Sequence, residues 1–203
     1  MSKPKQIKIC SIKEYLKLEE HSSVRHEYVR GQIFEMTGST EAHNIICGNL
    51  YVAFHGHLRG TGCRVFQNDM KVRVEIADCF YYPDLMVTCE PLKAKSVFKG
   101  LPTVIVEVLS ASTKAIDRRE KLVAYRQLAS LREYVLVHQN RELVEVYRKI
   151  SDEEWSLEKL FGSEVLALSG VPGDRFSIEV SAIYEGLELP PYVEETEEEY
   201  LLN

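Results

Sequence analysis

The run Thr103–Leu109 most constrains the fold of this chain. It reads Thr-Val-Ile-Val-Glu-Val-Leu, and so many β-branched residues predict a central strand that is buried on both faces. Side chains alternate along a strand, so Ile105, Glu107 and Leu109 share one face and three valines share the other. An unpaired carboxylate buried at Glu107 would be strongly destabilising. We therefore expect a metal ion, a strong hydrogen-bond donor or a partner Lys or Arg beside it.

A second carboxylate, Asp84, precedes another short apolar run, Leu85–Thr88, and follows Pro83. A Pro-Asp pair on its own indicates a simple turn. If the two apolar runs are neighbouring strands, however, Asp84 and Glu107 converge at one edge of the sheet, with the Val108 carbonyl close by. Hard oxygen ligands of this kind suit Mg²⁺ or Mn²⁺. The pair therefore predicts a divalent-metal site.

A helix is predicted to follow the Glu107 strand, over about residues 110–128, with several N-cap candidates at its start. Asp117 and Lys121 are four residues apart and share a face of this helix, and Tyr125 follows one turn later. One interpretation is an ordinary surface ion pair, which contributes little. The other is that Lys121 points over the sheet toward Glu107, where it would stabilise developing negative charge.

The other periodic segments predict an α+β or mixed α/β arrangement of layers. Residues 91–102, which separate two predicted strands, are expected to form an exposed basic loop. Loops of this kind often contain functional residues. The chain shows no P-loop, dinucleotide-binding fingerprint or G-x-S-x-G motif. Helices are predicted at 11–20, where a capping box opens the helix, and at 41–58. Strands are predicted at 25–36 (two, around Arg30-Gly31), 64–66, 70–75, 133–138, 143–148 (a hairpin with the preceding strand) and 155–161, and residues 175–184 are predicted to form a strand and a short turn of helix.

Length and charge predict one domain at residues 1–190, followed by an acidic tail at 191–203. The formal net charge is −6, and the tail contains five glutamates and no basic residue, so the body carries −6 + 5 = −1. A near-neutral body can still carry a local basic surface for phosphates. No signal peptide is apparent, and no apolar stretch approaches the length of a membrane span.

The five cysteines are widely scattered and never form a C-x-x-C pair. This spacing argues against both a disulfide framework and a structural zinc site. We therefore expect small buried thiols and a reducing, cytoplasmic environment. The residues concerned are Cys10, Cys47, Cys63, Cys79 and Cys89.

The motif combination resembles the Uma-type putative restriction endonuclease family of the PD-(D/E)XK nuclease superfamily. The resemblance covers roughly residues 11 to 190. It rests on Pro83-Asp84-Leu85, on Val-Ile-Val-Glu107-Val-Leu-Ser110, on Ser112-Thr113, Asp117, Lys121 and Tyr125, and on the strand Leu131–Val137.

This resemblance implies a restriction-endonuclease-like mixed β-sheet flanked by helices, with an added hairpin, and a metal-dependent DNA endonuclease activity. Asp84 matches the PD aspartate, Glu107 matches the (D/E) position, and Glu27 matches an N-terminal glutamate that would be a third ligand to Mg²⁺ or Mn²⁺. Position 109 is leucine, so the usual lysine of the motif is absent. In this family a lysine from the next helix substitutes for it, which matches Lys121.

Candidate contacts to the DNA backbone are basic residues of the 91–102 loop and of the following helix. They are Lys93, Lys95, Lys99, Arg118 and Arg119. A homodimer is plausible, because cutting two strands suits a two-fold assembly. The alternative function is a DNA-binding or regulatory module that has the nuclease fold but no catalytic activity. The leucine at position 109 and the near-neutral charge of residues 1–190 favour this alternative. His43 lies on the inward side of its helix, where a core histidine is the simpler interpretation and a site residue the alternative.

Overall fold

The alternation of side chains in strand β9 (Pro102–Leu109) decides how the layers of the fold are arranged. In the computed structural model, which describes residues 6–36, 38–110, 116–173 and 176–190, β9 is buried. Val104 and Val106 pack into a core shared with helix α2 (Glu41–His57), while Ile105 and Leu109 pack on the opposite face. The predicted two-sided burial of this strand is confirmed.

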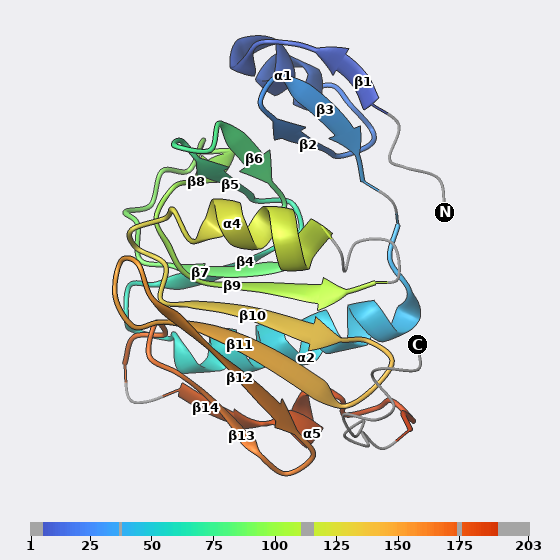
Figure 1. The fold of residues 1–203 in the computed structure, drawn as a ribbon, viewed down its shortest axis with the longest axis vertical. Coiled ribbons are helices and arrows are strands. Elements are labelled where there is room, and N and C mark those ends of the chain that lie inside the picture. The colour runs from blue at the N-terminus through green and yellow to red at the C-terminus, as the bar shows by residue number, and fades with distance from the viewer. Residues whose placement is uncertain (1–5, 37, 111–115, 174–175, 191–203) are drawn as a thin grey trace.

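The sheet around β9 has six strands in the order β12-β11-β10-β9-β7-β4. β9 is parallel to β10 and antiparallel to β7, so the end of β9 lies beside the start of β7 (Figure 1). β10 and β11 form the predicted antiparallel hairpin. The bounds are β4 Arg64–Gln67, β7 Leu85–Thr88, β10 Glu133–His138, β11 Leu143–Lys149 and β12 Trp155–Phe161.

A second six-stranded sheet, in the order β1-β3-β2-β6-β5-β8, lies beyond the helix that follows β9 (Figure 1). Helix α1 (Ile12–Glu19) begins with the predicted capping box, in which Ser11 and Glu14 satisfy each other's backbone amides. Its Tyr15 joins a small aromatic core with Tyr28 and Phe80. The bounds are β1 Gln6–Ile9, β2 His26–Val29, β3 Gln32–Glu35, β5 Lys71–Val74, β6 Cys79–Tyr81 and β8 Phe98–Lys99.

The segment after β9 is helical, as predicted, but its first described turn is a π-helix, η1 (Asp117–Lys121), which continues into α4 (Leu122–Tyr125). The predicted start of this helix falls at residues 111–115, outside the described part of the chain, as does the acidic tail at 191–203. A two-stranded sheet, β13 (Val165–Leu168) with β14 (Phe176–Glu179), and helix α5 (Val180–Ile183) complete the α2 side.

The α+β organisation is confirmed, but four strands were not predicted: β1, β6, β8 and β13. Each is two to four residues long, which is too short for alternation to be distinguished from a loop. Among the described residues, no helix is both long and apolar enough to cross a membrane.

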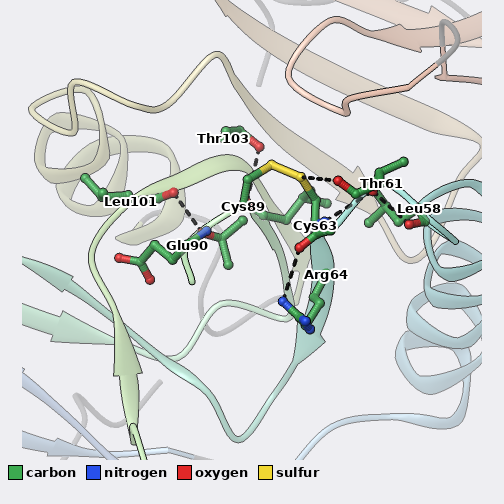
Figure 2. Close-up of a disulfide and its surroundings, with 11 residues drawn as sticks. Leu58, Thr61, Cys63, Arg64, Cys89, Glu90, Leu101 and Thr103 are labelled. Atoms are coloured by element: carbon green, nitrogen blue, oxygen red, sulfur yellow. Dashed lines mark hydrogen bonds between the residues drawn. A yellow bond between two sulfur atoms is a disulfide. The ribbon is translucent and has the colours of Figure 1, made fainter. Parts of the chain in front are cut away.

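The expectation of five free thiols is wrong, because Cys63 and Cys89 form a disulfide (Figure 2). Arg64 pairs with Thr88 in the antiparallel β4–β7 ladder, so the residues just beyond this pair face each other. Their Cα atoms are 4.1 Å apart although 26 positions separate them in sequence. Spacing along the chain could not reveal this pairing, since the strand register creates it. The reducing compartment was expected because the cysteines were predicted to be free thiols, and the disulfide removes that reason.

Closing the 26-residue separation between Cys63 and Cys89 should stabilise the native state by restricting the unfolded chain. The double variant Cys63→Ser/Cys89→Ser is therefore expected to lose about 3 kcal/mol of unfolding free energy. Urea unfolding under non-reducing conditions measures this loss. Cys10→Ser, which removes a thiol outside the disulfide, is the matched control and should unfold close to the wild type. An unchanged midpoint in the double variant would contradict the expectation.

Candidate active site

Glu107 lies near the end of β9, on the face opposite α2, and only 4% of it is exposed. Its Oε1 atom accepts hydrogen bonds from the Lys121 ammonium at 3.2 Å and from the Tyr125 hydroxyl at 3.0 Å. The side chain therefore has the donors that a buried carboxylate requires. Of the two interpretations of Lys121, the surface ion pair is wrong, because Lys121 is buried and reaches Glu107.

The π-helical turn η1 directs two charged side chains toward the sheet. Asp117 and Lys121 are both buried, and the Lys121 ammonium lies 3.2 Å from Asp117 Oδ1. Single π-helical turns often occur at functional sites, because the wider turn changes which residues face inward. The Tyr134 hydroxyl donates to the Asp117 carbonyl at 3.1 Å and ties this turn to β10. The fold thus fixes Lys121 from a neighbouring element.

Glu27 reaches the same ammonium from the other sheet. It lies in β2, and its Oε1 atom is 3.0 Å from Lys121 Nζ. The same oxygen accepts a 3.4 Å hydrogen bond from the Tyr82 amide, two residues before Asp84. Residues 27, 107 and 121 therefore meet although three separate elements supply them. The structure thus brings Glu107 and Lys121, which the sequence pattern indicated, together with Glu27, which the family resemblance indicated.

Asp84 lies at the edge of the sheet, immediately before β7, and two groups hold its carboxylate. Oδ2 accepts a 2.7 Å hydrogen bond from the Val108 amide. The predicted neighbour was the carbonyl of that residue, and the structure presents its N–H to Asp84 instead. Oδ1 lies 3.1 Å from Nε2 of His43 on α2. His43 is therefore a direct neighbour of Asp84, which its position on an inward helix face alone could not establish.

The cluster contains more acidic groups than basic ones. Glu27, Glu107 and Asp117 contact the ammonium of Lys121, and Asp84 lies near enough to Glu107 to act on its charge. Burial raises the pKa of Glu107 well above its usual value, and it also raises the pKa of Glu27. Burial acts to lower the pKa of Lys121, but Glu107, Glu27 and Asp117 outweigh it and raise that pKa well above its usual value. Lys121 therefore carries its proton, while burial favours the protonated, neutral forms of Glu107 and Glu27.

The donor chemistry of this cluster fits a hard divalent cation. Glu27, Asp84 and Glu107 offer carboxylate oxygens, the ligands that Mg²⁺ and Mn²⁺ prefer. Binding of a dication would release the proton that burial favours on Glu107. Glu27, Asp84 and Glu107 would hold such an ion after moving closer together, because they are not among the described residues whose ligand atoms all lie within 4.8 Å of one another. Lys121 would remain as a separate positive charge.

The basic residues that were predicted to contact the DNA backbone lie at different ends of the sheet and differ in exposure. The prediction that Lys99 is exposed is wrong, because it lies in β8, is 4% exposed and has its ammonium 3.7 Å from Glu90 Oε2. Lys93 and Lys95 are exposed, but their segment leads into the start of β9, whereas Glu107 lies near its end (Figure 1).

Arg118 and Arg119 lie next to Lys121 in η1, at the Glu107 end of the sheet. Arg118 is partly buried and bonds to Glu145 Oε1 at 2.6 Å, whereas Arg119 is exposed. Glu145 and His138, which also approach Arg118, were missed because each looks like an ordinary strand residue in the sequence. Arg119 is therefore the better placed of the two arginines for an external phosphate.

Comparison with known proteins gives a consistent result. The model of the family Uma2, described as "Putative restriction endonuclease", matches residues 12–180. In Synechocystis, "Uncharacterized protein slr1290" is 36% identical over 178 residues, 87% of this chain and 92% of that protein. "Uncharacterized protein sll1609" of the same organism is 32% identical over 158 residues, 76% of this chain and 89% of that protein.

A solved structure is similar in fold. A crystal structure from Anabaena variabilis, described as a "putative nuclease belonging to DUF820", aligns with a TM-score of 0.70 at 15% identity. The alignment covers 86% of this chain and 97% of that one. At this identity the likeness concerns the fold, and it confirms the expected restriction-endonuclease-like fold class.

Replacing Lys121 by methionine removes the only ammonium bonded to Glu27, Glu107 and Asp117 among the described residues. Lys121→Met should lose about 3–5 kcal/mol of unfolding free energy near pH 8, since it leaves buried carboxylates without a cation. The folded-state pKa values of Glu27 and Glu107 are raised, so their contribution to stability is present at low pH and is lost as pH rises. Losing the lysine raises both pKa values further, so the deficit should grow with pH.

Urea unfolding at pH 5 and pH 8 in the presence of a chelator measures this difference. The exposed lysine variant Lys13→Met is the control and should show little effect at either pH. The double variant Lys121→Met/Glu107→Gln should recover part of the stability at pH 8, because it removes one buried negative charge. Equal losses for Lys121→Met at both pH values would contradict the electrostatic explanation.

Proposed function

Because this chain belongs to the Uma2 family, which is described as "Putative restriction endonuclease", we propose that it is a metal-dependent endonuclease that hydrolyses phosphodiester bonds of DNA. The observation that carries the proposal is the position of Lys121. Residue 109 is leucine, yet the Lys121 ammonium from η1 lies 3.2 Å from Glu107 Oε1. A positive charge therefore lies beside Glu107 and Glu27, although position 109 lacks the lysine of the usual motif.

Each residue of the site has a defined task in this proposal. Glu27, Asp84 and Glu107 would hold Mg²⁺ or Mn²⁺, which would supply positive charge at the scissile phosphate. The Val108 amide donates a hydrogen bond that orients Asp84, and the His43 ring donates a second one when its proton is on Nε2. The Tyr125 hydroxyl orients Glu107 in the same way. The Lys121 ammonium stays protonated and donates hydrogen bonds to the attacking water or to a phosphoryl oxygen.

The backbone of the DNA would meet basic residues on two sides of the site. Arg119, with Arg118, lies at the Glu107 end of the sheet, and the exposed Lys93 and Lys95 lie at the far end of β9. Contacts of this kind position a duplex without reading its sequence. A homodimer would present two such sites to opposite strands. The cytoplasm is the proposed location, since DNA is the proposed substrate.

Cleavage of DNA by the full chain tests the proposal. Activity should require Mg²⁺ or Mn²⁺, and Asp84→Asn should reduce it by roughly a hundredfold or more, since a charged oxygen ligand is lost. Asp152→Asn, which alters a carboxylate that is 93% exposed, is the control and should retain activity. Circular dichroism confirms that both variants are folded. Cleavage that is unchanged in Asp84→Asn would overturn the assigned site.

The alternative is an inactive nuclease fold that binds DNA or regulates. The observation in its favour is the closed ion network, in which Lys121 already contacts three carboxylates. The cleavage assay distinguishes the two functions, because only the nuclease would hydrolyse DNA. Salt-dependent DNA binding without cleavage, in Mg²⁺ and in Mn²⁺, would support the alternative.

The salt dependence of DNA binding distinguishes the two basic segments. Arg119→Gln should weaken binding of duplex DNA regardless of sequence and should lower the slope of log K against log salt by about one. Lys93→Gln, the comparison variant, should have a smaller effect because its loop leads into the far end of β9. Fluorescence anisotropy in Ca²⁺, across a series of salt concentrations, measures both slopes. A larger effect from Lys93→Gln would place the main contact on the other side of the molecule.

A further inference from the structure

Helix α2 carries a histidine and a cysteine one turn apart, on the face that packs against the β9 sheet. His43 and Cys47 are separated by four residues, so both side chains lie on the same side of the helix. They are 9% and 4% exposed. This pair lies on the valine side of the sheet, whereas Glu27 and Lys121 lie with Glu107 on the other side. The proposed nuclease function does not use Cys47.

Asp84 completes a set of three potential ligands with this pair. The His43 ring contacts both other groups, with Nδ1 3.6 Å from Cys47 Sγ and Nε2 3.1 Å from Asp84 Oδ1. One ligand atom from each of the three residues can be chosen so that all lie within 4.8 Å of one another. Helix α2 supplies two of these groups, and the residue immediately before β7 supplies the third. One ion would take a single His43 nitrogen, so the side chains would rotate to bring the three atoms around it.

The ligand types select a different class of ion from the carboxylate cluster. A thiolate, an imidazole and a carboxylate are the ligands of Zn²⁺ and of similar ions such as Co²⁺, whereas Mg²⁺ prefers oxygen alone. Two ligands at i and i+4 of one helix are a common arrangement for binding zinc. Three protein ligands would leave a fourth tetrahedral position open to water, as in zinc sites that are not purely structural.

We propose that His43, Cys47 and Asp84 form a second metal site, selective for a thiophilic divalent cation such as Zn²⁺. On binding, the Cys47 thiol loses its proton to solvent, its sulfur bonds to the metal, and neutral His43 and ionised Asp84 complete the protein ligands. Asp84 is the residue that this site shares with the Mg²⁺ or Mn²⁺ site. Occupation by Zn²⁺ therefore draws Asp84 toward α2 and away from Glu107.

Co²⁺ is a suitable probe, because a thiolate bonded to it produces a charge-transfer absorption band in the near ultraviolet. The full chain is stripped of metal and kept without thiol reductants, so that Cys63 and Cys89 stay joined. Titration with Co²⁺ should produce the band, and excess Mg²⁺ should leave it in place. Cys47→Ser should abolish it, and His43→Gln should weaken Co²⁺ binding at least about tenfold. Cys79→Ser, which alters another buried free thiol, is the matched control and should retain the band.

Several results would overturn the second site. Absence of the band in the wild-type protein would do so without reference to any variant, and so would an equal band in Cys47→Ser. Displacement of Co²⁺ by an equal concentration of Mg²⁺ would overturn the selectivity. Circular dichroism of each variant shows whether a lost band reflects a lost ligand or a lost fold, and Cys47→Ala serves as the replacement if Cys47→Ser does not fold.

The metal site and the nuclease proposal can fail independently, because absorption measures binding without cleavage. Only the coupling between the sites rests on the proposed function. If the protein cleaves DNA in Mg²⁺, added Zn²⁺ should inhibit it, and Cys47→Ser should relieve that inhibition. Inhibition that is equal in the wild type and in Cys47→Ser would overturn the coupling. Absorption that depends on Cys47 in an inactive protein would support the second site and count against the nuclease.

Discussion

The ammonium of Lys121 holds together parts of the molecule that would otherwise repel one another. It lies within 3.2 Å of oxygens of Glu27, Glu107 and Asp117, and all four side chains are largely buried. A buried charge is tolerated only when it is paired and hydrogen-bonded. The strand of one sheet, the strand of the other and the π-helical turn between them are therefore tied by a single cation. The same cluster supplies the carboxyl groups of the proposed divalent-ion site.

The topology explains why this cluster forms at one end of the sheet. β7 and β9 are antiparallel neighbours, so the residue before β7 meets the residues near the end of β9. Because of that register, the Val108 amide donates a 2.7 Å hydrogen bond to the Asp84 carboxylate. Asp84 lies at the edge and can contact either face, with His43 on one side and the Glu107 cluster near the other. A carboxylate at such a position can be shared by two kinds of site.

Much of the candidate site could be predicted because its residues break local rules. Glu107 stands out in an otherwise apolar strand, and the helical spacing of Asp117 and Lys121 identifies a shared face. Other members could not be predicted in this way. Tyr82 contributes a backbone amide, which no side-chain pattern reports, and Lys99 looks like a loop lysine until β8 pairs with β5 and buries it.

The burial of β9 on both faces, the hairpin of β10 and β11, the helix α2 and the candidate residues Asp84, Glu107 and Lys121 could all be recognised in the sequence. They follow from periodicity and from the high free energy of an unpaired buried charge, which are local properties. Which groups meet in space depends on the packing of distant segments. Strand register joined Cys63 to Cys89 across 26 positions, and the packing of α2 against the sheet set His43 beside Asp84. Contacts between distant segments depend on how the layers pack, and no spacing along the chain records that geometry.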